Sequence, residues 1–232
     1  MAYILKSIPA DCRARNGFLW PTEPGAIVTA PDWDPAPQCG GGLHGALNGA
    51  GDYSLFCWDD DAVWICAEII GDDIVDLGGK VKVRQCRIIC AGARDAAAGY
   101  LVAQGMSAVI GGTATAGDYG TATAGGYGTA TAGYRGTATA GGYGTATAGG
   151  YGTATAGDYG TATAGDYGTA TAGRGGTATA GDYGTATAGD GGTIIITWHD
   201  AARRRLAIGY VGENIRAGAK YKCAEGALVE VK

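Results

Sequence analysis

Residues 112–127 read GTATAGDYGTATAGGY, and this stretch decides the fold of the chain. It contains two nearly identical octads, and the octad recurs ten times without a gap through residue 191. Each octad divides into a strand-forming segment, Thr-Ala-Thr-Ala, and a turn made of Gly, Asp and Gly. The repeat contains no aliphatic residue larger than Ala. Such a tract can be disordered, form a silk-like stacked sheet, or close into a solenoid whose coils bury one another.

Two features favour the solenoid. The period is strict, because no octad gains or loses a residue, whereas a disordered linker tolerates insertions. The eleventh octad begins GTIIITW at residues 192–198, so Ile194 and Ile196 replace Ala where a narrow core would have to be closed. We therefore predict a mainly β protein in which the repeat forms a capped β-solenoid.

Two octads, or 16 residues, make the shortest closed flat coil, so ten octads predict five coils and a rod about 24 Å tall. Strand alternation puts Thr113 and Thr115 on the opposite face from Ala114 and Ala116. We expect Ala inside, because the reverse would bury two hydroxyls per octad. The candidate binding residues are the outward threonines: Thr113, Thr115, Thr121, Thr123, Thr129, Thr131, Thr137, Thr139, Thr145, Thr147, Thr153, Thr155, Thr161, Thr163, Thr169, Thr171, Thr177, Thr179, Thr185 and Thr187.

Counted from Gly112, position eight of the octad is Tyr in seven of ten copies. The 16-residue spacing sorts this position into two edges. One edge carries Tyr119, Arg135, Tyr151, Tyr167 and Tyr183, and the other carries Tyr127, Tyr143, Tyr159, Gly175 and Gly191. Arg135 can then stack between two Tyr rings, and Arg174 at position seven relieves the repulsion between Asp158 and Asp190. The rings either pack over the turns or form self-association surfaces.

The flanks have ordinary composition and predict three parts: a small β-rich α+β domain at 1–108, the solenoid with its flanking cap strands at 109–197, and a C-terminal β cap at 198–232. In the first part, YSLFCW and AVWICAEII around Asp59–Asp61 indicate a hairpin. The stretch 78–92 alternates, with Val81 and Val83 on one face, and slips near Gln85, which suggests a bulge. Residues 93–105 predict a short helix, and further strands are expected at 193–198, 203–211, 220–223 and 227–231.

The totals exclude several classes of protein. A net charge of −5 and a pI of about 4.9 argue against a nucleic-acid partner. No apolar run is long enough to span a membrane, and the first residues lack the features of a signal peptide. Seven cysteines without a CxxC pair indicate neither a zinc ribbon nor a thioredoxin motif. They suit a reduced protein, so we expect a cytoplasmic or virion-associated location without membrane partners.

Three groups of residues invite a chemical interpretation. Cys39 and His44 could form a nucleophile pair, although the intervening glycines equally predict a tight turn. Asp59–Asp61 with Asp72 and Asp73 could bind a hard cation, or they form an acidic hairpin tip. Arg203–Arg205 alternate across a strand, which favours solvated edge residues over a basic face. We expect no catalytic residue, no metal site, no cofactor and no enzymatic activity.

The octad AGDYGTAT resembles that of bacterial ice-nucleation proteins, which run approximately Ala-Gly-Tyr-Gly-Ser-Thr-x-Thr. The resemblance covers residues 112–191. It implies a 16-residue β-solenoid with Thr-x-Thr rows facing ice and a Tyr ladder for dimerisation. Every octad here carries Thr-Ala-Thr, so both faces would qualify, while the residue before Tyr shifts the turn. Ice-nucleation proteins use far more coils, so five coils could bind ice or restrain its growth.

The flanks resemble phage and bacterial proteins with Gly/Ala-rich octad arrays. CGGGLHGAL at 39–47 is similar to their Gly-x-His signature, and residues 211–231 to their Ile-Lys-x-x-Thr-x-Tyr tail, with Arg216 and Ala219 in place of Lys and Thr. The sequence leads to two hypotheses. The first is a structural protein that self-associates through its Tyr edges. The alternative is an ice-binding protein that uses the Thr-Ala-Thr arrays.

Overall fold

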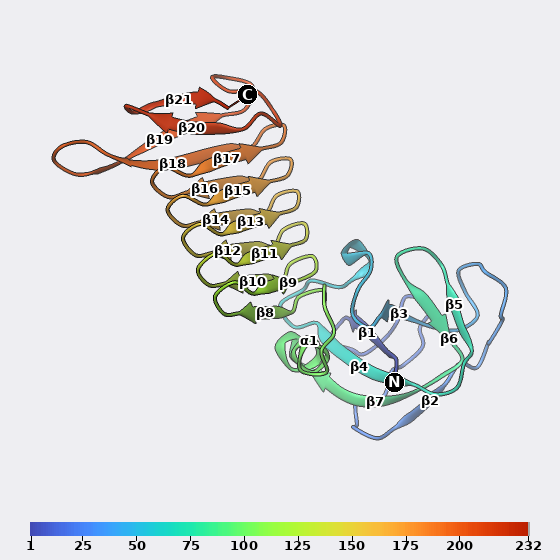
Figure 1. The fold of residues 1–232 in the computed structure, drawn as a ribbon. Coiled ribbons are helices and arrows are strands. Elements are labelled where there is room, and N and C mark those ends of the chain that lie inside the picture. The colour runs from blue at the N-terminus through green and yellow to red at the C-terminus, as the bar shows by residue number, and fades with distance from the viewer. Residues whose placement is uncertain (232) are drawn as a thin grey trace. The chain divides into compact units, whose positions relative to one another are not determined.

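The computed structural model describes residues 1–231, which divide into two compact units with a boundary between Gly112 and Thr113. Figure 1 shows a sheet-rich N-terminal unit and a stack of regular coils. One α-helix occurs within the described residues, and all other regular structure except a single 3-10 turn is β-strand. The mainly β prediction is therefore confirmed, and each unit is described by itself below.

The N-terminal unit is built on a seven-stranded sheet with the strand order β2-β7-β4-β1-β3-β6-β5. Every neighbouring pair of strands in this sheet is antiparallel. The strands are β1 (Tyr3–Ile8), β2 (Ile27–Thr29), β3 (Leu43–Leu47), β4 (Val63–Ile69), β5 (Ile74–Asp76), β6 (Val81–Val83) and β7 (Gln85–Gly92).

Both faces of this sheet are buried because the apolar residues of its central strands point both ways. On β1, Tyr3 and Leu5 pack with the helix α1 (Arg94–Ala103), whereas Ile4 and Ile8 pack with Trp20 on the other face. The helix contributes its small residues and Leu101 to the first of these cores. The expected helix at 93–105 and the β-rich α+β character of this unit are thus confirmed.

The predicted hairpin around Asp59–Asp61 is wrong in its first arm. Tyr53–Leu55 form a 3-10 turn, η1, because the Asp52 carboxylate accepts a hydrogen bond from the Ser54 backbone N–H at 2.9 Å. Phe56 and Trp58 then pack on Trp64 of β4, each with ring centroids 5.2 Å apart. The aromatic residues of 53–58 resemble a β-strand in composition, but they belong to a cluster in the core.

The predicted irregularity near Gln85 is a bend, and the bulge lies elsewhere. Arg84 separates β6, which lies between β3 and β5, from β7, which lies between β4 and β2. Val81 and Val83 do share one buried face, as predicted. The bulge falls in the β4–β7 pairing, where Cys66 pairs with Cys90 and Ala67 pairs with Ile88, which leaves Ile89 as the extra residue.

The second unit is the predicted solenoid. Its ten repeat strands are β8 (Thr113–Ala116), β9 (Thr121–Thr123), β10 (Thr129–Ala132), β11 (Thr137–Ala140), β12 (Thr145–Ala148), β13 (Thr153–Ala156), β14 (Thr161–Ala164), β15 (Thr169–Ala172), β16 (Thr177–Ala180) and β17 (Thr185–Ala188). Even-numbered strands form one parallel sheet and odd-numbered strands form the other. Each residue pairs with the residue 16 positions later, as Thr145 does with Thr161, so five coils of 16 residues stack in register.

The space between the two sheets is filled by Ala side chains. Ala138, Ala154 and Ala170 have no exposed surface, and the Ala residues from Ala122 to Ala188 are buried throughout. Ala114 and Ala116 in the first coil are only partly buried. Ala therefore lies inside and Thr outside, as the cost of burying hydroxyls requires.

The C-terminal end of the solenoid is closed by larger side chains and by strands that change direction. β18 (Thr193–His199) adds to the even-numbered sheet and places Ile194 and Ile196, both fully buried, beside Ala178 and Ala180. β19 (Arg204–Tyr210) pairs antiparallel with β18, β20 (Tyr221–Ala224) with β17, and β21 (Ala227–Glu230) with β20. The four expected C-terminal strands and the cap are confirmed.

Candidate functional site

Two flat threonine faces cover the broad sides of the solenoid. The first threonine face belongs to β8, β10, β12, β14 and β16, and the second belongs to β9, β11, β13, β15 and β17. The first contains Thr113, Thr115, Thr129, Thr131, Thr145, Thr147, Thr161, Thr163, Thr177 and Thr179. The second contains Thr121, Thr123, Thr137, Thr139, Thr153, Thr155, Thr169, Thr171, Thr185 and Thr187. What these faces bind stays a prediction.

Each face is a two-dimensional lattice of hydroxyl and methyl groups. Parallel in-register pairing repeats each Thr at about 4.8 Å between coils, and alternate residues repeat at about 6.7 Å along a strand. The Thr169 and Thr185 hydroxyl oxygens lie 3.2 Å apart, so neighbouring hydroxyls in a column can hydrogen-bond. Because the lattice has two nearly fixed periods, it can match another regular surface.

The two faces differ where they meet the cap. On the first face, the outward residues of β18 pair with Leu206, Ile208 and Tyr210 of β19, which are 58%, 40% and 48% exposed. On the second face, Thr185 pairs instead with the exposed Lys222 of β20. The first threonine face therefore continues into an apolar strip, whereas the second meets a single cation, Lys222, whose partner on β21 is Val229.

The Tyr rings form two stacked columns at the edges of the solenoid. In the first tyrosine edge, Tyr151 and Tyr167 have ring centroids 4.8 Å apart, and Tyr167 and Tyr183 have centroids 5.0 Å apart. In the second tyrosine edge, Tyr143 lies 4.9 Å from Tyr127 and 5.1 Å from Tyr159. Four of these rings remain 47–51% exposed despite stacking, namely Tyr143, Tyr151, Tyr159 and Tyr167.

Arg135 interrupts the first tyrosine edge as the sequence predicted. Its guanidinium lies 6.0 Å from the Tyr119 ring and 5.4 Å from the Tyr151 ring, within cation–π range. Sequence reasoning missed Tyr134, whose ring packs edge-on against Tyr119 and Tyr151 at 6.1 and 5.7 Å. Its position next to Arg135 in the repeat was the available signal.

The Tyr position is the left-handed residue of each turn. All seven of these Tyr residues have φ between 55° and 60°, and Gly175 and Gly191 have φ of 64° and 65° at the equivalent positions. The backbone N–H at this position donates a hydrogen bond to the backbone carbonyl of position seven in the next coil. The Tyr151 N–H, for example, donates to the Asp166 carbonyl at 2.8 Å. A non-glycine residue in this conformation costs about 1–2 kcal/mol. The chain therefore retains Tyr where Gly would relieve strain.

Asp at position seven links one turn to the next. The Asp118 carboxylate accepts the Tyr134 backbone N–H at 2.8 Å, and Asp158 accepts that of Arg174 at 2.8 Å. The Arg174 guanidinium also lies 3.9 Å from Asp158, which provides part of the predicted relief of like-charge stacking. These carboxylates satisfy backbone groups that the Tyr turn exposes.

Asp182 ties the turn of the ninth octad, between β16 and β17, to the cap. Its carboxylate accepts the Thr197 hydroxyl and contacts His199 Nδ1, while the Arg204 guanidinium lies 3.5 Å away. The hydrogen bond from Thr197 is the largest cause that lowers the pKa of Asp182, and His199 and Arg204 lower it further. Arg204 lies on the edge strand β19, where the sequence predicted solvated cations.

The other sequence candidates lie in the N-terminal unit and do not gather. Cys39 is exposed on a turn whose glycines, Gly40–Gly42, all have positive φ. His44 lies on β3, and its Nε2 atom is buried without a hydrogen-bond partner among residues 1–231. Asp59–Asp61 form an exposed turn before β4, and Asp73 forms an ion pair with Arg84 at 3.6 Å.

Within residues 1–231, no three His, Cys, Asp or Glu side chains are placed to hold a metal ion. The helices of the described chain include none that is long and apolar enough to cross a membrane.

The fold and these surfaces define a capped β-solenoid repeat protein. The chain is similar to an ice nucleation protein of Pseudomonas fluorescens, with 27% identity over 100 residues. The match covers 42% of this chain and spans 8% of that protein. The similarity and the repeat architecture are those of a structural or ice-related repeat protein.

Comparisons with family models and with solved structures found no match. The resemblance of the flanks to phage proteins finds no support in the comparisons. The similarity to an ice nucleation protein is therefore the finding from these comparisons that bears on function.

Proposed function

We propose that this protein is a non-enzymatic structural protein that associates with further copies of itself through its tyrosine edges. The observation that carries the proposal is the retention of Tyr in a left-handed turn where Gly175 and Gly191 show that Gly fits. The backbone gains nothing from Tyr at this position, so the benefit must come from the ring. Stacking within one chain offsets part of the strain, and the half-exposed rings leave apolar surface for a partner.

The arrangement of the edges supports lateral assembly. A single tyrosine edge that met its copy would close a two-fold dimer, whereas two opposite edges could propagate into an open array. Antiparallel cap strands cover the C-terminal end of both sheets, which disfavours growth by stacking at that end. The expected partner is therefore a second copy that lies beside the first.

Replacing Tyr151 and Tyr167 by Gly should weaken self-association several-fold while leaving the solenoid intact, because Gly occupies the same turn position elsewhere in the chain. Sedimentation velocity over a range of concentrations measures the association, and circular dichroism verifies the β-structure. Negative-stain microscopy of the wild-type protein separates closed dimers from lateral arrays.

The matched control is Asp158→Gly, which changes a neighbouring turn position that is already Gly at Gly142 and keeps every ring. This variant should assemble like the wild-type protein. A wild-type protein that stays monomeric, or a Tyr variant that assembles as the wild type does, would contradict the proposal.

The second candidate function is ice binding through a threonine face. It is favoured by the two-period Thr lattice and by the name of the similar protein from Pseudomonas fluorescens. The spacings of about 4.8 and 6.7 Å are close to oxygen spacings on an ice surface. Five coils offer a small lattice, so binding or shaping of ice crystals is the expected activity.

Thr145→Tyr with Thr161→Tyr should abolish ice shaping if the first threonine face is used, because two large rings interrupt the centre of its lattice. Thr153→Tyr with Thr169→Tyr is the matched change on the second face. Microscopy of ice-crystal habit in the presence of each protein gives the readout. If the wild-type protein does not alter the habit, or if neither pair of changes affects it, the ice-binding function is excluded.

The proposal also includes a location in the cytoplasm or a virion, with no nucleic-acid or membrane partner. Seven cysteines, all free within the described residues, suit a reducing compartment. The net charge of −5 disfavours phosphate-rich partners.

A further inference from the structure

The N-terminal unit contains a cavity of about 540 Å³ that lies where its sheet splits. The strands β1 and β3 pair only at Ile4 with Leu47 and at Leu5 with Ala46. Beyond these two pairs the strands separate, although β1 continues to Ile8 and β3 begins at Leu43. The residues that a longer ladder would have paired all line the cavity: Lys6, Ser7, Ile8, Leu43, His44 and Gly45.

The walls of this split are held by their outer neighbours. β1 remains paired with β4 from Tyr3 through Ile8, and β3 remains paired with β6 from Gly45 to Leu43. The opening is therefore preformed, and it does not depend on a loop moving aside. Its volume falls within the roughly 300–1,000 Å³ that is typical of small-molecule sites.

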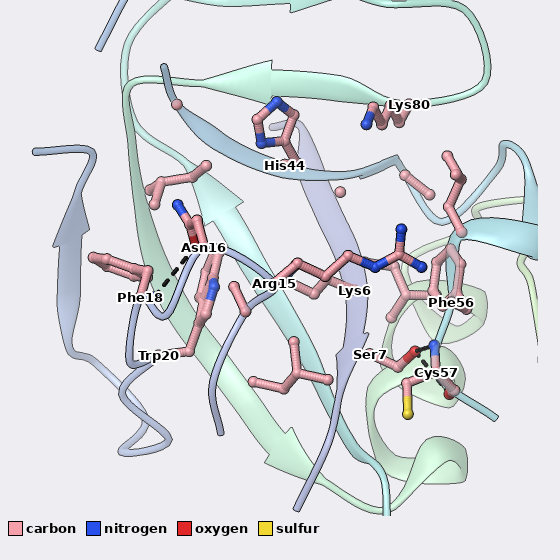
Figure 2. Close-up of a pocket in the computed structure, with 18 of the residues that line it drawn as sticks. Lys6, Ser7, Arg15, Asn16, Phe18, Trp20, His44, Phe56, Cys57 and Lys80 are labelled. Carbon is pink, nitrogen blue, oxygen red and sulfur yellow. Dashed lines mark hydrogen bonds between the residues drawn. The ribbon is translucent and has the colours of Figure 1, made fainter. Parts of the chain in front are cut away.

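The cavity is cationic in an otherwise acidic protein. Its lining includes the cations Lys6, Arg13, Arg15 and Lys80 against the carboxylates Asp32 and Asp52. The Asp52 carboxylate already accepts the Ser54 backbone N–H, so its oxygens are partly occupied. Figure 2 shows Lys6 and Arg15 in the middle of the cavity, with His44 and Lys80 above them.

Two polar groups in this cavity lack an ion-pair or hydrogen-bond partner within residues 1–231. The Lys6 ammonium forms no ion pair with a carboxylate of residues 1–231 and lies 5.3 Å from the centre of the Trp20 ring. Burial, together with Lys80 and Arg15, lowers the pKa of Lys6 to about 8. His44 Nε2 is buried without a partner, and burial is the main cause that lowers the pKa of His44. Such groups are costly unless a ligand satisfies them.

Three aromatic side chains also line the cavity. Phe18 and Trp20 line one side of the cavity and Phe56 lines the other (Figure 2). Phe18 and Trp20 pack edge to face with ring centroids 5.8 Å apart, which fixes their orientation. A flat apolar body can contact these rings while an anionic group reaches the cations.

We propose that this cavity binds a small organic anion with an aromatic body, whose carboxylate or phosphate is held by Lys6, Arg15 and Lys80. The site lies wholly in the N-terminal unit and does not involve the tyrosine edges or the threonine faces. Its occupancy is therefore independent of self-association and of ice binding, and each proposal can fail without the other.

The test uses three probes of similar shape on the full-length protein: benzoate, phenyl phosphate and the uncharged benzyl alcohol. Isothermal titration calorimetry should detect saturable binding of at least one anion, and benzyl alcohol should bind at least about tenfold more weakly. Comparison of benzoate with phenyl phosphate distinguishes a carboxylate site from a phosphate site. Absence of binding by both anions, or equal binding of benzyl alcohol, would overturn the proposal.

Lys6→Met should weaken binding of the preferred anion by about tenfold or more, because it removes the partly buried cation at the centre of the site. Arg15→Gln changes an exposed residue, so it tests the same site with little risk to folding. Lys222→Met, in the cap of the solenoid, is the control and should bind as the wild type does. Unchanged binding by both Lys6→Met and Arg15→Gln would show that the cations do not hold the ligand.

Discussion

At the scale of single residues, Lys6 is the clearest departure from what stability alone would select. Its side chain is desolvated among Trp20, Arg15 and Lys80, and no carboxylate within residues 1–231 compensates its charge. An apolar residue of similar length would avoid the cost of desolvating a charge. The retention of Lys6 therefore points to binding.

Lys6→Met should raise the free energy of unfolding of the N-terminal unit at pH 7, and the gain should shrink as the pH approaches 10.5. Below pH 8, folded and unfolded chains both hold the proton on Lys6, so the full cost of desolvating this partly buried charge applies. Between pH 8 and 10.5 the unfolded chain binds more protons, so the wild-type protein gains stability with rising pH relative to the variant. Urea unfolding at pH 7 and pH 10, followed by Trp fluorescence, measures the difference. If the difference in unfolding free energy between Lys6→Met and the wild-type protein stayed constant with pH, this account of Lys6 would be wrong.

At the scale of the elements, the solenoid depends on glycines that allow its turns to stack. A Cβ added at Gly165, position six of its octad, would lie 2.7 Å from the backbone N of Gly150 in the preceding coil. The same position in the first octad, Gly117, has nothing within 4 Å of an added Cβ. The two glycines occupy the same position of the octad. They differ because a preceding coil packs against Gly165, whereas none packs against Gly117.

Gly165→Ala should therefore destabilise the solenoid by about 1–3 kcal/mol, because the turn backbones must separate to admit the methyl group. Gly117→Ala is the internal control and should have little effect or stabilise slightly, since Ala restricts the unfolded chain. Thermal unfolding monitored by far-ultraviolet circular dichroism gives the comparison. Equal changes in the two variants would show that stacking of the turns does not limit stability.

The elements also show where sequence reasoning works. The repeat strands, the coil length and the Ile194 cap follow from periodicity, because identical octads meet identical neighbours. The segment 53–58 was misread because Asp52 caps a 3-10 turn and the aromatic residues serve a core cluster. The split between β1 and β3 could not be predicted, because it depends on which distant strands pair with each of them.

At the scale of the whole molecule, the two units differ in kind. Four of the five Trp residues belong to the N-terminal unit, whereas ten of the thirteen Tyr residues belong to the second unit. The first unit has an irregular core built from large side chains, and sequence patterns indicated only its class. The second has a core made almost wholly of Ala, and its geometry could be predicted nearly residue by residue. The threonine faces and the tyrosine edges of the solenoid were therefore foreseeable, and the cavity was not.

The alternation of octads between two sheets restricts how this protein can change length. A coil uses two octads, and the cap strand β18 joins the even-numbered sheet while β20 joins the odd-numbered one. Replication slippage in a repetitive gene adds or removes octads freely. Because the octads are nearly identical, an odd change would move β18 and the apolar residues of β19 to the sheet that now contains β9, β11, β13, β15 and β17, whereas an even change would leave them on their present sheet. Selection that keeps the apolar residues of β19 beside the first threonine face would therefore adjust the size of the solenoid in steps of 16 residues.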